Sequence, residues 1–179
     1  ITLVDRKPPG SHLNAKAQEY LKGVLRDMAI GFETHEGGLY SDTAQLQRWK
    51  KDAQFVVNCT GFMAPDLARL SGLRCDEKNR VYVNQHLRAE GYDNILVAGD
   101  SAHYEFGSEA IPYNGCATAM PMGTYAGETA ARLLAGKAPG EFRYGFTFQC
   151  ISLGRKKGII QFLNARTGKA IGPVLTGKP

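Results

Sequence analysis

The sequence predicts an α/β fold in which short buried strands, in a parallel or mixed sheet, alternate with flanking helices and lead into a β-rich C-terminal tail. Compact apolar or β-branched runs, typical of strands, occur at residues 1–5, 54–59 and 94–98. Apolar residues that recur at three- and four-residue steps predict helices over 11–29 and 117–135. A chain of 179 residues is also long enough to bury a core.

The first elements read as strand, helix and strand. Ile1 to Asp5 forms the opening strand and runs into the turn Pro8-Pro9-Gly10, after which Ser11 caps the first helix. Residues 30–34 then form a second strand, so a helix separates two strands that we expect to be parallel. The polar stretch that ends at Asp52 reads as an irregular or hairpin connection.

The middle of the chain carries two further apolar runs. Residues 54–59 are short and rich in β-branched side chains, which favours a buried strand. A short helical turn is expected over 67–70 and a further strand over 81–83. Residues 94–98 form another buried strand, which ends at the dipeptide Gly99-Asp100.

The last third combines the second long helix with short strands. Pro121 is expected in the first turn of the helix over 117–135, where a missing N–H costs nothing, and Gly136 is its expected C-cap. Beyond it, aromatic-rich strands are predicted over 142–151 and 159–163. The basic turn Arg155-Lys156-Lys157-Gly158 separates these two strands.

Composition excludes several classes of protein. The chain has 22 Lys and Arg against 17 Asp and Glu, a net charge of +5, with no long run of like charges, so no nucleic-acid partner is indicated. No stretch approaches the roughly 20 apolar residues of a membrane span. The chain has four cysteines: Cys59, Cys75, Cys116 and Cys150. They are too far apart in the sequence for CxxC redox or zinc pairs. We therefore expect buried, reduced thiols, a cytoplasmic protein and no metal site. The opening strand, without an initiator methionine, reads like the middle of a longer polypeptide.

Gly99 and Asp100 are the first candidates for a binding site. Ligands of open α/β sheets bind just beyond the carboxyl ends of strands, which is where this dipeptide lies. Gly99 permits a close backbone approach, and Asp100 could accept hydrogen bonds from the hydroxyls of a polyol. An ordinary turn after a strand would have the same two residues.

The block from Val81 to Gly136 resembles the second FAD-binding motif of the two-dinucleotide-binding-domain flavoproteins, the superfamily of FAD-dependent pyridine nucleotide oxidoreductases. The resemblance implies Rossmann-like portions, with Gly99 and Asp100 on the ribityl or pyrophosphate part of FAD. It also implies that the backbone of Cys116, Ala117 and Thr118 meets the flavin ring, because a helix N-terminus suits the carbonyl edge of a reduced, anionic flavin.

Within this superfamily the chain is most similar to the type-II NADH dehydrogenases. Asp5 at the end of the first strand matches the acidic residue that binds the ribose of NAD, whereas Arg6 could serve the 2′-phosphate of NADPH. The resemblance implies the later part of an NAD(P)H-binding domain over 1–62, the later part of an FAD-binding domain over 63–138, and the start of a C-terminal domain over 139–179. Neither of the family's two GxGxxG phosphate loops occurs in the sequence.

The resemblance implies transfer of hydride from NADH or NADPH to FAD and of electrons onward to a quinone or another small acceptor. Cys116-Ala117 stands where type-II enzymes often have Ala-Gln, which leaves the acceptor open, and another branch such as ferredoxin or monodehydroascorbate reductase is an alternative. His103 and Glu109 are weak candidates for proton transfer. The chain alone is expected to be inactive, and a non-catalytic interaction unit without flavin is the other alternative.

The tail leaves two kinds of partner open. Alternating aromatic residues from Phe142 to Phe148 beside the basic turn suit an anionic membrane surface, so a peripheral contact with the cytoplasmic membrane is one expectation. The family's C-terminal domain also implies a homodimer contact. An aromatic core face beside a solvated basic turn is the plainer alternative.

Overall fold

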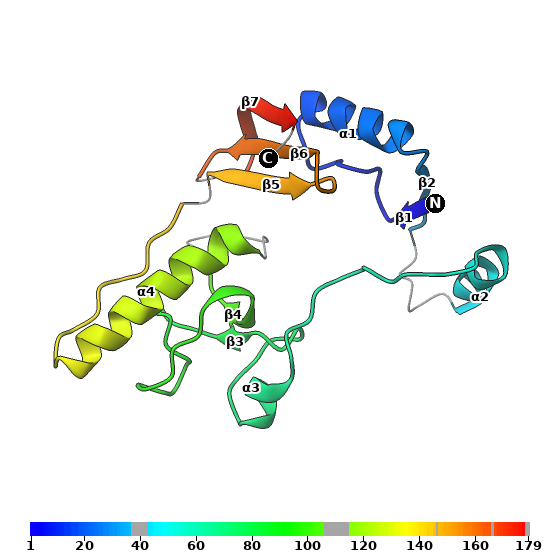
Figure 1. Ribbon diagram of the computed structural model, residues 1–179. Helices are drawn as coiled ribbons and strands as arrows, with labels where there is room; N and C mark the ends of the chain where they lie inside the picture. The colour runs from blue at the N-terminus through cyan, green and yellow to red at the C-terminus, as the bar shows by residue number, and fades with distance from the viewer. Residues whose placement is uncertain (37–42, 106–114, 146, 166, 178–179) are drawn as a thin grey trace. The chain divides into compact units, whose positions relative to one another are not determined.

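The computed structural model shows an α/β chain with four helices, a short 3₁₀ turn and seven strands in the part described (Figure 1). The residues that the structure describes are 1–36, 43–105, 115–145, 147–165 and 167–177. They fold into two compact units: unit 1 contains Ile1–Gly61, Gln149–Phe162 and Ala170–Pro179, and unit 2 contains Phe62–Phe148 and Leu163–Lys169. The α/β class is therefore confirmed, but the strands of the described residues form three small sheets and not one continuous sheet.

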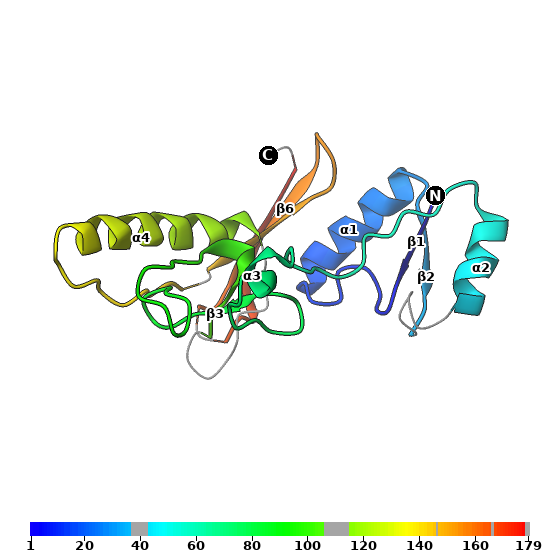
Figure 2. The same ribbon diagram turned by 90° about the horizontal axis from the view of Figure 1, so that it is seen from below.

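Unit 1 begins with a strand–helix–strand motif. β1 (Thr2–Asp5) and β2 (Gly31–Thr34) are parallel, with Leu3 opposite Phe32, and α1 (Ala15–Asp27) connects them. Figure 2 shows the two strands side by side between α1 and α2. Parallel strands need such a crossover connection, so the predicted arrangement of the first elements is confirmed.

The start of α1 differs from the prediction. Asn14 is the N-cap and its side chain accepts a hydrogen bond from the Ala17 N–H at 2.9 Å, so the predicted cap at Ser11 is wrong. The N–H of Asn14 itself donates to Oε1 of Gln161 at 2.7 Å. Ser11 instead belongs to the preceding turn, where its N–H donates to the Pro8 carbonyl at 3.1 Å.

The apolar face of α1 packs on a three-stranded sheet at the C-terminal end of the chain. Its strands are β5 (Phe148–Ser152), β6 (Gly158–Leu163) and β7 (Ala170–Gly177), in that order. The core between helix and sheet contains Leu13, Ala17, Leu21, Ile159 and Val174. The prediction of β6 is confirmed. The strand expected from residue 142 begins only at Phe148, and β7 was not predicted.

A helix replaces the irregular connection expected before Asp52. α2 (Thr43–Asp52) consists mostly of polar residues, so it has no regular spacing of apolar residues that would predict a helix. Its interior holds Ala, Gln, Leu, Arg and Lys, all of which favour a helix. Trp49 of α2 contacts the His35 ring edge-on, with ring centroids 5.2 Å apart. Residues 37–42 of the same connection lie outside the described residues.

The buried strand predicted over 54–59 is wrong. The segment contains no strand, and Phe55 and Val57 are 86% and 80% exposed. Asn58 Oδ1 accepts a hydrogen bond from the Thr60 N–H at 3.0 Å, which closes a local turn. A buried strand needs neighbouring strands on both sides, and none of the described strands pairs with this segment.

Unit 2 holds the short helix α3 (Leu67–Leu70), the parallel pair β3 (Val81–Tyr82) and β4 (Ala102–His103), and the long helix α4 (Cys116–Leu134). Residues 94–98 are not a full strand, although the Val97 N–H donates to the Leu87 carbonyl at 2.9 Å. The core of this unit contains Leu87, Ala102, Met122 and Phe142.

α4 begins and ends within one residue of its prediction. Pro121, however, is its sixth residue and not part of the first turn, so the Ala117 carbonyl lacks its usual intrahelical donor. Gly136 has φ +68°. Its N–H donates to the Leu133 carbonyl and the Lys137 N–H to the Arg132 carbonyl, which is a Schellman motif. The C-cap itself is Ala135, so the predicted glycine ends the helix one position beyond the cap.

The structure also bears on the expectations about membrane spans and cysteines. In the part of the chain that is described, no helix has the length and apolar character needed to cross a membrane. All four cysteines are free, but Cys59, Cys116 and Cys150 are exposed, so the expectation of buried thiols is wrong for these three.

Candidate functional site

The predicted Gly-Asp dipeptide forms a tight 3₁₀ turn, η1 (Gly99–Ser101), against the first turns of α4. Gly99 has φ +69°, a left-handed conformation that L side chains rarely adopt. A Cβ atom on Gly99 would lie 3.2 Å from the Cβ of Ala119. The glycine therefore allows both the turn and its close contact with the helix.

Asp100 binds the N-terminus of α4 directly. Its Oδ1 accepts a hydrogen bond from the Gly115 N–H at 2.9 Å, and Gly115 is the N-cap of the helix. Because glycine has no side chain to cap a helix, the carboxylate from η1 supplies the negative charge that the positive end of the helix dipole favours. Oδ2 makes no hydrogen bond with any residue that the structure describes.

The first turn of α4 places the other predicted flavin residues beside Asp100. Thr118 is buried, and its Oγ1 donates to the Gly115 carbonyl at 3.0 Å. Cys116 is exposed and Ala117 half-buried. The structure thus brings Gly99, Asp100 and the three helix residues together at one point of unit 2.

His103 lies in a different environment, a charged network that the sequence did not predict. Its Nδ1 is 3.0 Å from Oδ2 of Asp76 and 3.1 Å from Nη2 of Arg80. The Arg80 Nε donates to the same Asp76 oxygen at 2.7 Å. His103 Nδ1 can either donate to Asp76 or accept from Arg80, and Asp76 already has Arg80 as a partner.

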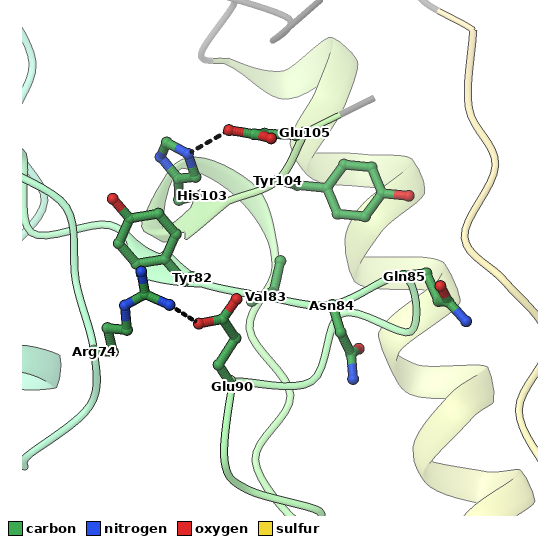
Figure 3. Close-up of a pocket in the computed structure, with 9 residues that line it drawn as sticks. All are labelled: Arg74, Tyr82, Val83, Asn84, Gln85, Glu90, His103, Tyr104 and Glu105. Atoms are coloured by element: carbon green, nitrogen blue, oxygen red, sulfur yellow. Dashed lines mark hydrogen bonds and ion pairs between the residues drawn. The ribbon is translucent and has the colours of Figure 1, made fainter. Parts of the chain in front are cut away.

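A shallow cleft opens beside this network. Figure 3 shows His103, Tyr82 and Arg74 in a row, with Glu105 beside His103 and Glu90 beside Arg74. The imidazole of His103 contacts the Tyr82 ring at 4.5 Å between centroids, and the Arg74 guanidinium lies 4.4 Å from the same ring. These contacts occupy the surface of Tyr82, so its ring has little room to stack on a ligand.

Asp76 is ionised at the centre of this network. Burial raises the pKa of its carboxyl, but hydrogen bonds from the Arg80 side chain and N–H, from His103 and from the Lys78 N–H outweigh it. The net pKa of Asp76 lies well below its usual range. The charged turn around Asp76 and Arg80 was visible in the sequence, but nothing there linked it to a histidine 27 residues away.

Asp5 and Glu109 are the two remaining predicted residues. Asp5 lies exposed at the end of β1 in unit 1, where its Oδ1 accepts a hydrogen bond from the Arg6 N–H at 2.6 Å. Glu109 falls outside the described residues. Within those residues no group of three or more His, Cys, Asp or Glu side chains could hold a metal ion.

The fold of the chain is shared with solved structures. The chain aligns over 90% of its length with two of them, at TM-scores of 0.58 and 0.55. Together with the curated relatives described below, these structures confirm the predicted resemblance to the FAD-dependent pyridine nucleotide oxidoreductases. No family model matches the sequence.

The particular relatives are the following. An NADH dehydrogenase-like protein of Mycobacterium tuberculosis, MT1860, is 27% identical over 135 residues, which are 71% of this chain and 33% of the relative. Rv1812c, from another strain, matches equally.

Among solved structures, an FAD-dependent pyridine nucleotide-disulphide oxidoreductase from Desulfovibrio vulgaris is 18% identical and has a TM-score of 0.58, and this chain covers 42% of it. A water-forming NADH oxidase from Lactobacillus brevis, bound to NADH, is 17% identical with a TM-score of 0.55 and 36% covered. The chain thus spans about a third of the curated relatives that it matches.

Proposed function

We propose that this chain is a portion of an FAD-dependent NAD(P)H oxidoreductase, in which hydride passes from NADH to FAD and electrons then pass to a quinone or another small acceptor. The observation that carries the proposal is the hydrogen bond from the Gly115 N–H to Asp100. It puts a carboxylate and a helix N-terminus side by side, which are the two groups needed for the ribityl chain and the ring of a flavin.

The residues at the junction fit a flavin on chemical grounds. The second carboxylate oxygen of Asp100 has capacity to accept a hydrogen bond from a ribityl hydroxyl. The N–H groups of Cys116 and Ala117 are in the first turn of α4, where backbone donors have no intrahelical acceptor. They would face the carbonyl edge of the ring. When bound, FAD supplies the redox chemistry, and the protein orients it and excludes competing reactions.

The nicotinamide dinucleotide would be held by unit 1. Asp5 ends β1 and is exposed, as a carboxylate that binds ribose hydroxyls must be. Because Asp5 can accept hydrogen bonds from the ribose hydroxyls of NAD, we propose NADH as the donor. Arg6 directly after it could pair with a 2′-phosphate, so NADPH is the alternative to compare. The sequence contains no glycine-rich phosphate loop, so we expect neither dinucleotide to bind this chain tightly.

Titration with FAD tests the proposal. Wild-type chain should quench flavin fluorescence, whereas Asp100→Asn, which keeps an oxygen for the Gly115 N–H, should weaken binding about tenfold by removing a charged acceptor. Asp66→Ala is the matched control, because Asp66 is an exposed carboxylate of unit 2 whose Oδ2 lies 3.8 Å from Nη2 of the exposed Arg69. Equal quenching by wild type and Asp100→Asn would contradict the assignment of Asp100.

A second candidate is an interaction unit that binds no flavin. The absence of GxGxxG and the exposed apolar segment 54–59 favour it. A wild-type chain that fails to quench FAD at any concentration would support this candidate. Reduction of the flavin by NADH, followed by reoxidation with a quinone or with ferricyanide, would separate the quinone-reducing branch from the other branches of the superfamily.

A further inference from the structure

The sheet of β5, β6 and β7 turns one face toward α1 and the other away from it (Figure 1). Its strands are consecutive in the chain and adjacent in the sheet, and short turns join them, so the sheet is antiparallel. Side chains of a strand alternate between the two faces. Because Ile159 and Val174 pack on α1, their neighbours lie on the opposite face, which we call the outer face. It contains Cys150, Ile160, Phe162, Ile171, Pro173 and Leu175.

The outer face is apolar, uncharged and accessible. Ile160 is 37% exposed, Ile171 47% and Leu175 53%. No residue of the three strands is charged. Exposed apolar side chains that lie next to one another on one surface mark a site of interaction, so the outer face is a candidate for docking.

Positive charge is concentrated at the ends of the same sheet. Residues 142–179 contain seven Lys and Arg and no Asp or Glu, whereas the whole chain has 22 against 17. The turn between β5 and β6 carries Arg155, Lys156 and Lys157, and the turn before β7 carries Lys169. Lys157 pairs with α1, but Arg155 and Lys156 are exposed and form no ion pair with any residue that the structure describes.

This combination of charge and apolar surface distinguishes three kinds of partner. A second copy of the chain would bring another strongly positive segment to the same place, and the two would repel each other. Single-stranded nucleic acid binds by stacking its bases on aromatic rings, whereas the outer face is mostly aliphatic. An anionic lipid surface takes up apolar side chains and attracts the basic turns beside them.

We propose that the outer face docks on an anionic lipid surface. Ile171 and Leu175 enter the boundary between headgroups and acyl chains, and Arg155 and Lys156 lie against the headgroups. This surface differs from the one expected from the sequence, because Phe142 is 5% exposed and belongs to the core of unit 2. The docking needs no flavin, so it is independent of the assignment of Asp100.

Cosedimentation with lipid vesicles tests the proposal. The probes are vesicles of phosphatidylcholine mixed with phosphatidylglycerol, and vesicles of phosphatidylcholine alone. The wild-type chain should bind the charged vesicles at least about tenfold more tightly than the neutral ones, since several basic residues act together. Rising salt should weaken this binding, because salt screens exposed charges.

Variants separate the apolar contribution from the charged one. Ile171→Ser combined with Leu175→Ser should weaken binding to the charged vesicles at least about tenfold. Leu134→Ser is the matched control and should bind like wild type, because Leu134 is 91% exposed at the end of α4 in unit 2. Arg155→Gln combined with Lys156→Gln should weaken binding about twentyfold, at about fivefold for each charge. An unchanged far-UV circular dichroism spectrum would show that each variant folds.

A fluorescent label on Cys150 reports which face is in contact. Cys150 and Cys59 are both exposed thiols of unit 1, and only Cys150 lies on the outer face. In variants that keep one of these cysteines and replace the other three by serine, an environment-sensitive dye on Cys150 should shift to the blue with charged vesicles. The same dye on Cys59 should not shift.

Four results would overturn the proposal. One is equal sedimentation with charged and neutral vesicles, or none with either. Another is unaltered binding of the Ile171 and Leu175 double variant. A third is an equal shift of the dye at Cys59 and Cys150. The last is a shift at Cys150 without vesicles, either on addition of an oligonucleotide or as the chain concentration rises, since nucleic acid or a second copy would then cover the face. No cofactor is present in these experiments, so their failure leaves the FAD titration unaffected, and the reverse also holds.

Discussion

At the scale of single residues, Asp76 shows how one carboxylate organises a site. Its side chain is 7% exposed and joins the turn from Asp76 to Arg80 with His103 of β4. An ionised carboxylate that accepts several hydrogen bonds stabilises the folded state. Removing the carboxylate would leave these buried donors without an acceptor, which would destabilise the protein. The network is therefore a structural support for the segment that follows η1.

The pH dependence of stability should reveal Asp76. Because its pKa is lower in the folded than in the unfolded state, its contribution is complete above the unfolded value of about 4 and is lost as the pH falls below it. Urea unfolding of Asp76→Asn should show a loss of about 2 kcal/mol at pH 7. The difference from wild type should shrink as the pH is lowered below about 4. A difference that is the same at pH 7 and in acid would contradict this account.

Asn14 and Gln161 form a helix cap from two elements. In a capping box, the third helical residue returns a side-chain acceptor to the N–H of the cap. Ala17 at that position has none, and Gln161 of β6 supplies the acceptor instead. Gln161 is completely buried, so this contact also ties α1 to the three-stranded sheet.

Removing the cap should destabilise unit 1. Asn14→Ala is expected to cost about 1 kcal/mol, whereas Asn14→Ser should retain most of the stability because a serine oxygen also caps. The measurement is the free energy of unfolding by urea, followed through hydrogen exchange in α1. Equal losses in both variants would mean that the side-chain cap is not the cause.

At the scale of elements, the packing of η1 on α4 depends on Gly99. Gly91 provides a matched control, because it has φ +83° in the same unit but open space where a Cβ would lie. Gly91→Ala should cost about 1 kcal/mol for the backbone alone, and Gly99→Ala should cost more, since its Cβ also meets Ala119. Thermal unfolding of the two variants measures the difference. Equal shifts in Tm would show that the contact with α4 carries no energy.

The sequence predicted elements well where their signal was local. The Schellman end of α4, the turn at Gly99 and the first strand–helix–strand motif all rest on residues close together in the chain. The prediction failed where structure depended on distant partners. Residues 54–59 carry a strand composition without a neighbouring strand, and the cap of α1 involves Gln161, 147 residues away.

The candidate site shows the same division. Gly99 and Asp100 were found from their place after an apolar run, and the helix residues followed from the resemblance. The hydrogen bond from Gly115 to Asp100 could not be predicted, because it depends on how α4 packs on η1. The network of Asp76 and Arg80 was missed because its members come from two separate segments, the turn from Asp76 to Arg80 and β4.

At the scale of the whole molecule, the chain divides into two units that hold different parts of the proposed function. Unit 2 contains the η1–α4 junction that we propose for the flavin, and unit 1 contains Asp5 at the end of β1. In unit 2, Oδ2 of Asp100 accepts no hydrogen bond from any described residue, which leaves it available to a ligand.

The most direct test of the flavin assignment is an NMR titration of the ¹⁵N-labelled chain with FAD. The amide resonances of Gly99, Asp100 and Gly115 to Thr118 should shift together and saturate, while those of α1 in unit 1 should not move. Shifts confined to other residues, or no shifts at FAD concentrations that solubility allows, would contradict the claim that this junction binds a flavin.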